Sequence, residues 1–257
     1  MKKNLKKNQL FKEEKLNTKS YFEYLKNLEK YYDKSVGTTV EKLYNFPKYV
    51  PRQSLTNFLS KYEIFKKIQN IQGSIVECGV LFGGGLMSFA HFSSIFEPVN
   101  NQRRIIGFDT FSGFGDLHPT DKLGSSQYMK KGGLAVDSFN DLKECILRYD
   151  ENRFLNHIPK IELVKGDATK TIPKYVKENP HLVVSLLHLD FDIYKPTKVA
   201  LENLVPRMPK GGIIIFDELN SKDFQGETQA LMDSLGISKL KIERFPFDSV
   251  ISYAVLD

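Results

Sequence analysis

Two aspartates separated by one residue end the most hydrophobic segment of the chain. This segment, HLVVSLLHLDFDIYKPT, covers residues 181–197 and contains Asp190 and Asp192. Residues i and i+2 of a β-strand point to the same face, so two carboxylates at this spacing can act together. A second acidic pair, Asp217 and Glu218, ends the apolar segment GGIIIFDE. These two pairs are the first candidates for chemistry.

Four carboxylates at one apolar sheet edge would repel one another and raise each other's pKa. A hard divalent cation such as Mg²⁺ would relieve the repulsion, because it binds carboxylate and water oxygens. The structural alternative is that Asp192 caps the helix beginning near Pro196 and that Asp217 closes a turn. The spacing favours the metal site. His188 shares a strand face with Asp190 and could orient it, but we interpret it as a core histidine.

A glycine-rich segment, VECGVLFGGG, follows another short apolar run. Glu77 ends the predicted strand, Gly79 permits a tight turn, and Gly83 and Gly84 let a ligand approach the backbone before a helix begins. The spacing matches neither GxGxxG, as an NAD-dependent oxidoreductase would need, nor the phosphate-binding GxxxxGK[ST]. An acidic residue two positions before the first glycine suits an amino-bearing ligand better than a phosphate.

Two more strand ends complete a nucleoside-binding pattern. RIIGFD ends at Asp109, whose carboxylate can accept hydrogen bonds from ribose hydroxyls. KIELVKGD ends at Asp167, which can accept a hydrogen bond from an adenine amino group. Each feature alone is common. The ordered set of glycine loop, Asp109 and Asp167 predicts an adenosine-containing cofactor.

These groups must be positioned by a sheet whose strand ends meet at one edge. Five apolar runs, each ending in a polar or acidic residue, alternate with amphipathic segments typical of helices. The runs are residues 74–79, 104–109, 160–167, 182–190 and 211–218. This alternation predicts a parallel sheet covered on both faces, which binds ligands beyond the carboxyl ends of its strands. Residues 239–257 predict two strands joined by a turn, so we expect an α/β fold with a seven-stranded, mostly parallel sheet and an antiparallel last strand.

The chain is expected to have an N-terminal helical extension, residues 1–65, and a sheet domain, residues 66–257. In LTNFLSKYEIFKKIQN, hydrophobic side chains recur at helical spacing, which favours packing over a binding surface. The insertion at residues 111–136 is rich in Gly, Ser and Lys and is too long for an ordinary connection. Because it lies at the predicted ligand edge, we expect it to act as a mobile lid.

Composition narrows the class of protein. The formal net charge of +6 is concentrated in residues 1–20, which hold seven lysines and two glutamates. This favours a solvated basic arm over a nucleic-acid-binding surface. The sequence has no apolar stretch of membrane-spanning length, and its two cysteines form no disulfide framework. We therefore expect a cytoplasmic protein, and composition leaves a homo-oligomer open.

The combination of VECGVLFGGG, GFDTFSGF, LDFDIY and PTKVALENLVPRMPKGGIIIFDE resembles the macrocin O-methyltransferase (TylF/MycF-like) family. The resemblance covers roughly residues 70–220 and implies a Rossmann-like class I methyltransferase fold that uses S-adenosylmethionine to methylate sugar hydroxyls. It places the methionine part of the cofactor on the glycine loop and the ribose on Asp109 and Thr110. The cofactor-binding residues that the resemblance implies are Glu77, Gly79, Gly83, Gly84, Asp109 and Thr110. Asp167 and Asp190 complete the expected set of cofactor-binding residues.

The resemblance also implies a mechanism. Asp190 would act as general base, while Asp192, Asp217 and Glu218 would bind Mg²⁺ against the vicinal hydroxyls of a sugar or glycoside. Two departures from the family pattern matter: GGG replaces GGS at residues 83–85, and Asp-Glu-Leu replaces Asp-Asp-Tyr at residues 217–219. A catechol-type O-methyltransferase and a non-catalytic S-adenosylmethionine-binding protein remain the alternatives.

Overall fold

The computed structural model describes residues 17–257, so the predicted basic arm at residues 1–20 lies almost entirely outside the described part. The chain divides into two compact units, which meet between Leu55 and Thr56. This division precedes the boundary expected at residue 65. The physical reason lies in helix α3 (Arg52–Ile68), because Ile64, Phe65 and Ile68 are fully buried in the core of the second unit.

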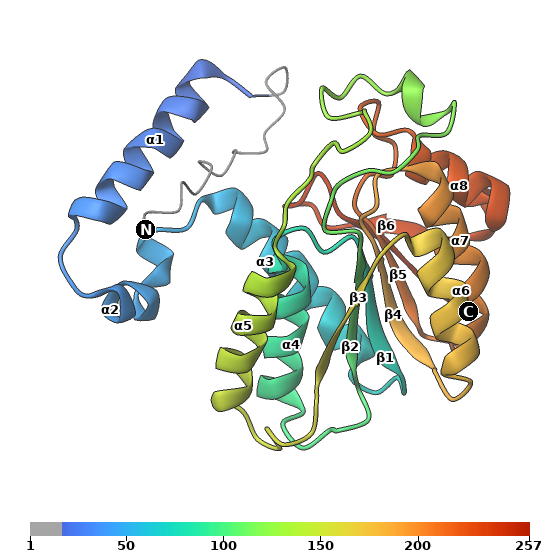
Figure 1. Ribbon diagram of the computed structural model, residues 1–257, viewed down its shortest axis with the longest axis horizontal. Coiled ribbons are helices and arrows are strands. Elements are labelled where there is room, and N and C mark those ends of the chain that lie inside the picture. The colour runs from blue at the N-terminus through green and yellow to red at the C-terminus, as the bar shows by residue number, and fades with distance from the viewer. Residues whose placement is uncertain (1–16) are drawn as a thin grey trace. The chain divides into compact units, whose positions relative to one another are not determined.

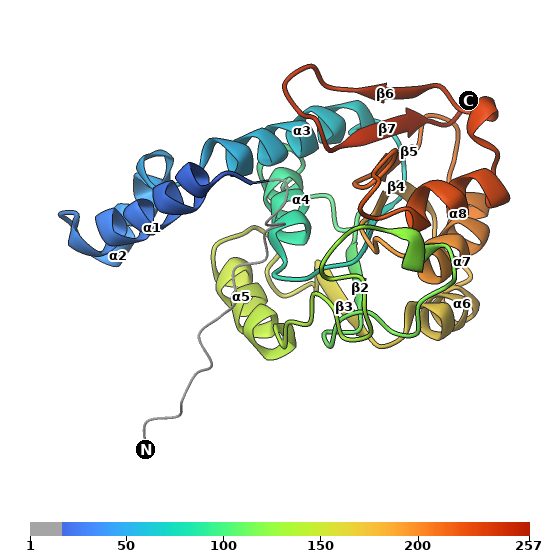
Figure 2. The ribbon, with the colours of Figure 1, turned by 90° about the horizontal axis from the view of Figure 1, so that it is seen from above.

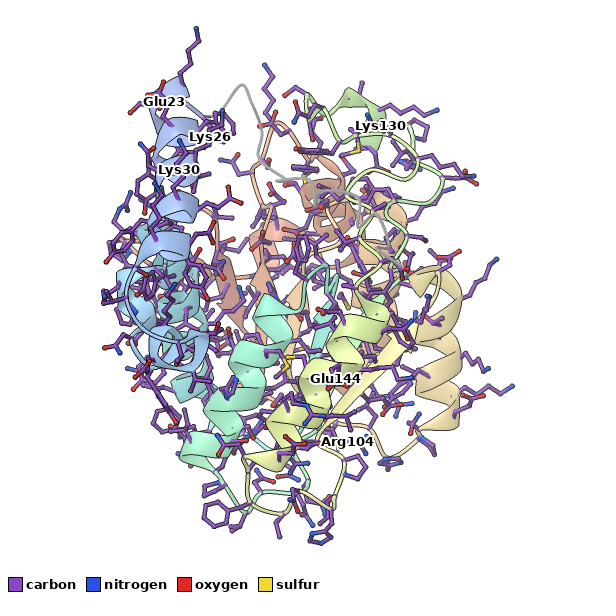
Figure 3. The ribbon with its side chains drawn as sticks, turned by 60° about the vertical axis from the view of Figure 1, so that its left-hand side comes forward. Glu23, Lys26, Lys30, Arg104, Lys130 and Glu144 are labelled. Carbon is purple, nitrogen blue, oxygen red and sulfur yellow. The ribbon has the colours of Figure 1, made fainter. Side chains whose placement is uncertain are left out.

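The first unit contains short helices stabilised by side-chain caps. It consists of α1 (Lys19–Lys34), α2 (Thr39–Tyr44) and the 3₁₀ helix η2 (Phe46–Lys48). Thr38 and Glu41 form a capping box at the start of α2, which satisfies two backbone N–H groups that the helix leaves unpaired. Helix α1 carries charged side chains such as Glu23, Lys26 and Lys30 (Figure 3), and it buries none of its residues.

The second unit is a seven-stranded sheet with strand order β3-β2-β1-β4-β5-β7-β6. All neighbouring pairs from β3 to β5 are parallel, and β7 runs antiparallel to β5 and β6. The strands are β1 (Ser74–Cys78), β2 (Ile105–Asp109), β3 (Ile161–Lys165), β4 (Val184–Leu189), β5 (Ile213–Phe216), β6 (Ile242–Arg244) and β7 (Ser252–Val255). The predicted α/β fold, with its seven strands and antiparallel last strand, is confirmed.

Helices cover both faces of this sheet (Figure 1). They are α4 (Gly84–Phe96), α5 (Phe139–Glu151), α6 (Ala168–Glu178), α7 (Tyr194–Leu204) and α8 (Gly226–Ser234), with short 3₁₀ helices η3 (Asp121–Leu123), η4 (Val205–Arg207) and η5 (Ile237–Lys239). One core lies between the sheet and α3, α4 and α5, and the other lies against α6, α7 and α8. Within residues 17–257, none of the helices has both the length and the hydrophobicity that a membrane span requires.

Strand alternation decides which core each side chain enters. On β4, Leu186 belongs to the core beneath α3 to α5, while Leu187 and Leu189 belong to the opposite core. His188 and Asp190 therefore share the face of Leu186. The same alternation on β5 places Asp217 on that face, since Ile215 belongs to the same core as Leu186.

Candidate active site

The sheet register brings acidic and imidazole groups of three strands together. Glu77 on β1 is paired with His188 on β4, which is paired in turn with Ile215 on β5. Two residues further along, Asp190 and Asp217 lie just beyond the carboxyl ends of β4 and β5. The nearest ligand atoms of His188, Asp190 and Asp217 all lie within 4.8 Å of one another.

Glu77 and His188 form a buried hydrogen-bonded pair. The Oε1 atom of Glu77 lies 3.0 Å from Nδ1 of His188, and the side chains are only 2% and 0% exposed. Burial raises the pKa of Glu77 to about 8, against the opposing charge of Lys61. Burial lowers the pKa of His188 to about 3, and the charge of Lys61 lowers it further. At neutral pH these pKa values describe a neutral carboxyl group hydrogen-bonded to a neutral imidazole, and not an ion pair.

Each member of this pair has a second polar atom that is unsatisfied. Oε2 of Glu77 and Nε2 of His188 are buried and have no hydrogen-bond partner among the described residues. An unsatisfied buried polar atom in a native fold needs an explanation, such as an unseen ion or water. His188 is buried, as expected of a core histidine, and it also offers a ring nitrogen within 4.8 Å of ligand atoms of Asp190 and Asp217.

The two aspartates of the opening segment are both perturbed. Burial and then the charge of Asp217 raise the pKa of Asp190 well above its usual value. Burial and then the charge of Glu218 raise the pKa of Asp192 in the same way. Asp192 also has a left-handed backbone, with φ of 62°. Neighbouring carboxylates therefore contribute to the raised pKa of two of the four acids, Asp190 and Asp192.

A further acid, which sequence reasoning missed, lies beside this cluster. Glu227 on α8 is completely buried, and its Oε1 accepts a hydrogen bond from the backbone N–H of Glu218 at 3.0 Å. Burial and then the charge of Asp217 raise the pKa of Glu227 well above its usual value. Its position in the first turn of a helix carries no strand-end signal, so only the packing of α8 reveals it.

The glycines of the loop between β1 and α4 serve different purposes. A Cβ atom at Gly79 would overlap the carbonyl oxygen of Asp190, and one at Gly83 would overlap Leu142; both glycines also have positive φ, 101° and 83°. A Cβ at Gly85 would overlap the carboxylate of Glu77. Only Gly84 of these four has no protein atom within 4 Å of an added Cβ. The open side of the loop is therefore at Gly84, where α4 begins.

Asp109 organises this loop from the end of β2. Its Oδ2 accepts hydrogen bonds from the N–H groups of Val80 and Leu81, at 2.7 and 3.0 Å, and its Oδ1 accepts one from Phe111 at 2.6 Å. Thr110 donates its hydroxyl to the carbonyl of Gly113. These three backbone bonds hold the loop. A carboxylate has about four acceptor sites, so Oδ1 can accept one more hydrogen bond, and ribose binding by Asp109 stays a prediction.

Asp167, the predicted adenine contact, is exposed and caps helix α6. Its Oδ1 accepts hydrogen bonds from the backbone N–H and the hydroxyl of Thr169, at 3.0 and 2.7 Å. This is the ordinary role of aspartate at a helix N-cap. It lies after β3, two strands away from the central β1, so it stays apart from the carboxylate cluster.

Hydrogen bonds and a ring stack hold the insertion, residues 111–136, against the start of α7 and the loop before α8. Asp121 accepts hydrogen bonds from the N–H groups of His118 and Tyr194, at 2.7 and 2.8 Å, so it caps α7 in the place where we considered Asp192. The His118 and Tyr194 rings stack with centroids 4.2 Å apart. Ser125 donates to Asp223 in the loop before α8. Figure 2 shows the insertion, in green, beside α7 and α8.

A groove lies between the insertion and α8. Its volume is about 310 Å³, and it is lined by Thr120, Asn220, Ser221, Lys222, Gln225, Thr228, Gln229 and Met232. Hydroxyl and amide groups of this kind form hydrogen bonds with the hydroxyl groups of neutral polar ligands. Its lining begins at Asn220 on this side, two residues after Glu218 in the chain.

Three of the described residues offer ligand atoms spaced for a divalent cation, and they share only Asp217 with the predicted set of Asp192, Asp217 and Glu218. Among residues 17–257, the acids and imidazoles whose ligand atoms are mutually close are His188, Asp190 and Asp217. Asp192 and Glu218 do not join Asp217 in a group of that spacing, although their charges affect one another. The orphaned Nε2 of His188 and the crowded carboxylates together provide a donor set for a cation.

Comparison with solved structures supports this architecture. A structure of CalS11, described as a calicheamicin methyltransferase, is 32% identical, covers 96% of this chain and 98% of its own, and has a TM-score of 0.89. A structure of CalS11 without ligand, described as a TDP-rhamnose 3'-O-methyltransferase, is 32% identical over 93% of this chain and 95% of its own, with a TM-score of 0.80.

Two curated sequences are less similar to this chain than these structures are. The 8-demethyl-8-(2,3-dimethoxy-alpha-L-rhamnosyl)-tetracenomycin-C 4'-O-methyltransferase of Streptomyces olivaceus is 28% identical over 162 residues, 58% of this chain. The phenylalanine–tRNA ligase alpha subunit of Saccharolobus solfataricus is 22% identical over 220 residues, 84% of this chain. The chain spans about half the length of these curated relatives, 53% and 44%. The family model for macrocin O-methyltransferase (TylF) matches residues 49–239, and the chain belongs to that family.

Proposed function

We propose that this protein transfers a methyl group from S-adenosylmethionine to a hydroxyl group of a sugar, with a nucleotide sugar or a glycoside as acceptor. The observation that carries the proposal is the perturbed carboxylate cluster at the carboxyl ends of β4 and β5, beside a loop that is open at Gly84. The family and the sugar-methylating relatives support the reaction class and the kind of acceptor.

The cofactor would bind along the loop that precedes α4. The first N–H groups of α4 have no acidic side chain in their turn, and a helix N-terminus favours a negatively charged group such as the methionine carboxylate. Gly84 leaves space for this approach. Glu77 would act indirectly, since its carboxylate is buried against Gly85 and His188.

Asp190 would remove the proton from the acceptor hydroxyl. As the hydroxyl oxygen forms a bond to the methyl carbon, the carbon–sulfur bond breaks, S-adenosylhomocysteine leaves, and the proton passes to a carboxylate oxygen. A carboxylate within hydrogen-bond reach of the hydroxyl can accept this proton as a general base. A divalent cation, with Mg²⁺ as the one expected from carboxylate ligands, would make a bound hydroxyl more acidic.

The test combines substrate screening with one matched pair of variants. Protein, S-adenosylmethionine and a panel of TDP-sugars and rhamnosides are incubated, and S-adenosylhomocysteine and methylated sugar are measured by mass spectrometry. Asp190→Asn should lower turnover by roughly 10²- to 10⁴-fold with unchanged cofactor affinity. The control is Asp116→Asn, because Asp116 is 82% exposed in its ion pair with Lys131. Full activity of Asp190→Asn, or cofactor binding without transfer to any sugar, would contradict the proposal.

A further inference from the structure

The His188 side chain is arranged as a metal ligand is arranged in proteins. One ring nitrogen, Nδ1, is held at 3.0 Å by the Glu77 carboxyl group, and the other, Nε2, is buried without a partner among the described residues. Histidines that bind metals usually have their second nitrogen fixed by a carboxylate or carbonyl in this way. A side chain that served only to fill the core would not need an oriented, unsatisfied nitrogen.

The imidazole lies among suitable partners. The nearest ligand atoms of His188, Asp190 and Asp217 are all within 4.8 Å of one another. Two ligands of one cation are at most about 4.4 Å apart, twice a metal–ligand distance of about 2.2 Å. The three side chains therefore need only small rotations to bind one ion. Because Nδ1 is occupied by Glu77, Nε2 is the atom left to bind it.

We propose that His188, Asp190 and Asp217 form a mixed nitrogen–oxygen site that binds a transition-metal ion such as Mn²⁺, Co²⁺ or Zn²⁺ more tightly than Mg²⁺, with Glu77 positioning the imidazole. The inference deepens the proposed function, on which it rests for the role of the ion. It departs from the expected all-carboxylate set of Asp192, Asp217 and Glu218.

The chemistry of the donors decides which cation is preferred. Mg²⁺ binds oxygen ligands in near-ideal octahedral geometry and keeps several waters, whereas imidazole suits later first-row ions. Three protein ligands leave positions open, as in catalytic metal sites, so substrate oxygen atoms could still reach the ion. Asp190 can bind the ion through one oxygen and keep the other for the acceptor proton.

The first experiment uses the unmodified protein. Metal-free protein is loaded with Mn²⁺ and examined by electron spin-echo envelope modulation, which detects ¹⁴N bound to Mn²⁺. We expect imidazole ¹⁴N coupling, and in competition titrations we expect Zn²⁺ and Mn²⁺ to bind at least tenfold more tightly than Mg²⁺. An all-oxygen Mn²⁺ signal, an absence of binding, or equal affinity for Mg²⁺ would overturn the site.

Variants then identify the nitrogen. His188→Gln should abolish the ¹⁴N coupling, while His181→Gln, at an exposed histidine seven residues earlier, should leave it unchanged. Glu77→Gln should retain the coupling and weaken the metal affinity by about 10- to 100-fold, the usual effect of losing such a partner. Coupling that survives in a folded His188→Gln would overturn the assignment. Because none of these measurements uses methyl transfer, a protein with the metal site and no sugar methylation would contradict the proposed function alone.

Discussion

Replacing Gly79 with alanine should damage the fold and the site together, whereas the same change at Gly84 should not. Gly79 has φ of 101°, which costs a residue with a Cβ roughly 1–2 kcal/mol. The new Cβ would also overlap the backbone carbonyl of Asp190, which a side-chain rotation cannot relieve. Overpacking of this kind costs about 1–3 kcal/mol. The expected loss for Gly79→Ala is therefore about 2–5 kcal/mol of unfolding free energy.

The control, Gly84→Ala, has the opposite expectation for stability. No protein atom lies within 4 Å of its added methyl group, and alanine favours a helix over glycine by up to about 1 kcal/mol. The methyl group would, however, occupy the side of the loop that we assign to the cofactor. Gly84→Ala should thus keep or raise stability and weaken S-adenosylmethionine binding. Gly83 offers no such separation, because a side chain there would overlap Leu142.

Thermal unfolding and calorimetric titration with S-adenosylmethionine measure the two effects. For a chain of this size, 1 kcal/mol corresponds to roughly 2–4 °C in Tm, so Gly79→Ala should lower Tm by about 5–15 °C. Gly84→Ala should change Tm by no more than about 3 °C. A Gly79→Ala protein within about 1 kcal/mol of the wild type would refute the close approach to Asp190. Unchanged cofactor affinity in Gly84→Ala would refute the open face of the loop.

Two further predictions concern pH and the insertion. Because the pKa of Glu77 rises from 4.5 to about 8 on folding, the folded state holds a proton that the unfolded state releases, and wild-type stability should fall as pH rises through this window. Glu77→Gln cannot ionise, so urea unfolding should show it gaining about 2 kcal/mol relative to the wild type between pH 6.5 and 8; a constant difference would contradict the buried neutral carboxyl. Asp121→Asn should cost about 1–3 kcal/mol locally, because one of two backbone donors loses its acceptor, and trypsin should cleave the insertion at least tenfold faster than in Asp116→Asn. Equal cleavage rates would mean that Asp121 does not hold the insertion.

Hydrophobic patterning was sufficient to predict the sheet. Runs of Val, Ile and Leu ending in acids identify the strands, and the period of two places Asp190 and His188 on one face. The pattern does not show which side chain of a neighbouring strand contacts a given residue. The contact between His188 and Glu77 could not be predicted, because the two residues are 111 positions apart and meet only through the β1–β4 register.

The contacts of the glycines and acids outside the strands could not be predicted from the sequence either. A sequence shows that Gly79 and Gly83 permit unusual backbone angles, but not that their neighbours are Asp190 and Leu142. Glu227 has no distinguishing local pattern, and its burial depends on how α8 packs. Asp121 lies in a segment whose composition suggested a mobile lid, yet its carboxylate accepts two backbone hydrogen bonds. Local patterns therefore predicted the elements, while contacts between distant segments determined the roles of individual side chains.

The contacts of Asp121 have a consequence for exchanging the insertion among relatives. The Asp121 carboxylate and the first N–H of α7 lie directly over Gly226, where any added Cβ would overlap both. An insertion taken from a relative would therefore have to fit three groups that contact one another here. They are Asp121, the first N–H of α7 and Gly226 at the start of α8. Chimaeras that transfer residues 111–136 together with the segment around residue 226 should express as folded proteins more often than chimaeras that transfer the insertion alone. The insertion and the start of α8 would thus be exchanged as one module, whose two pieces are far apart in the gene.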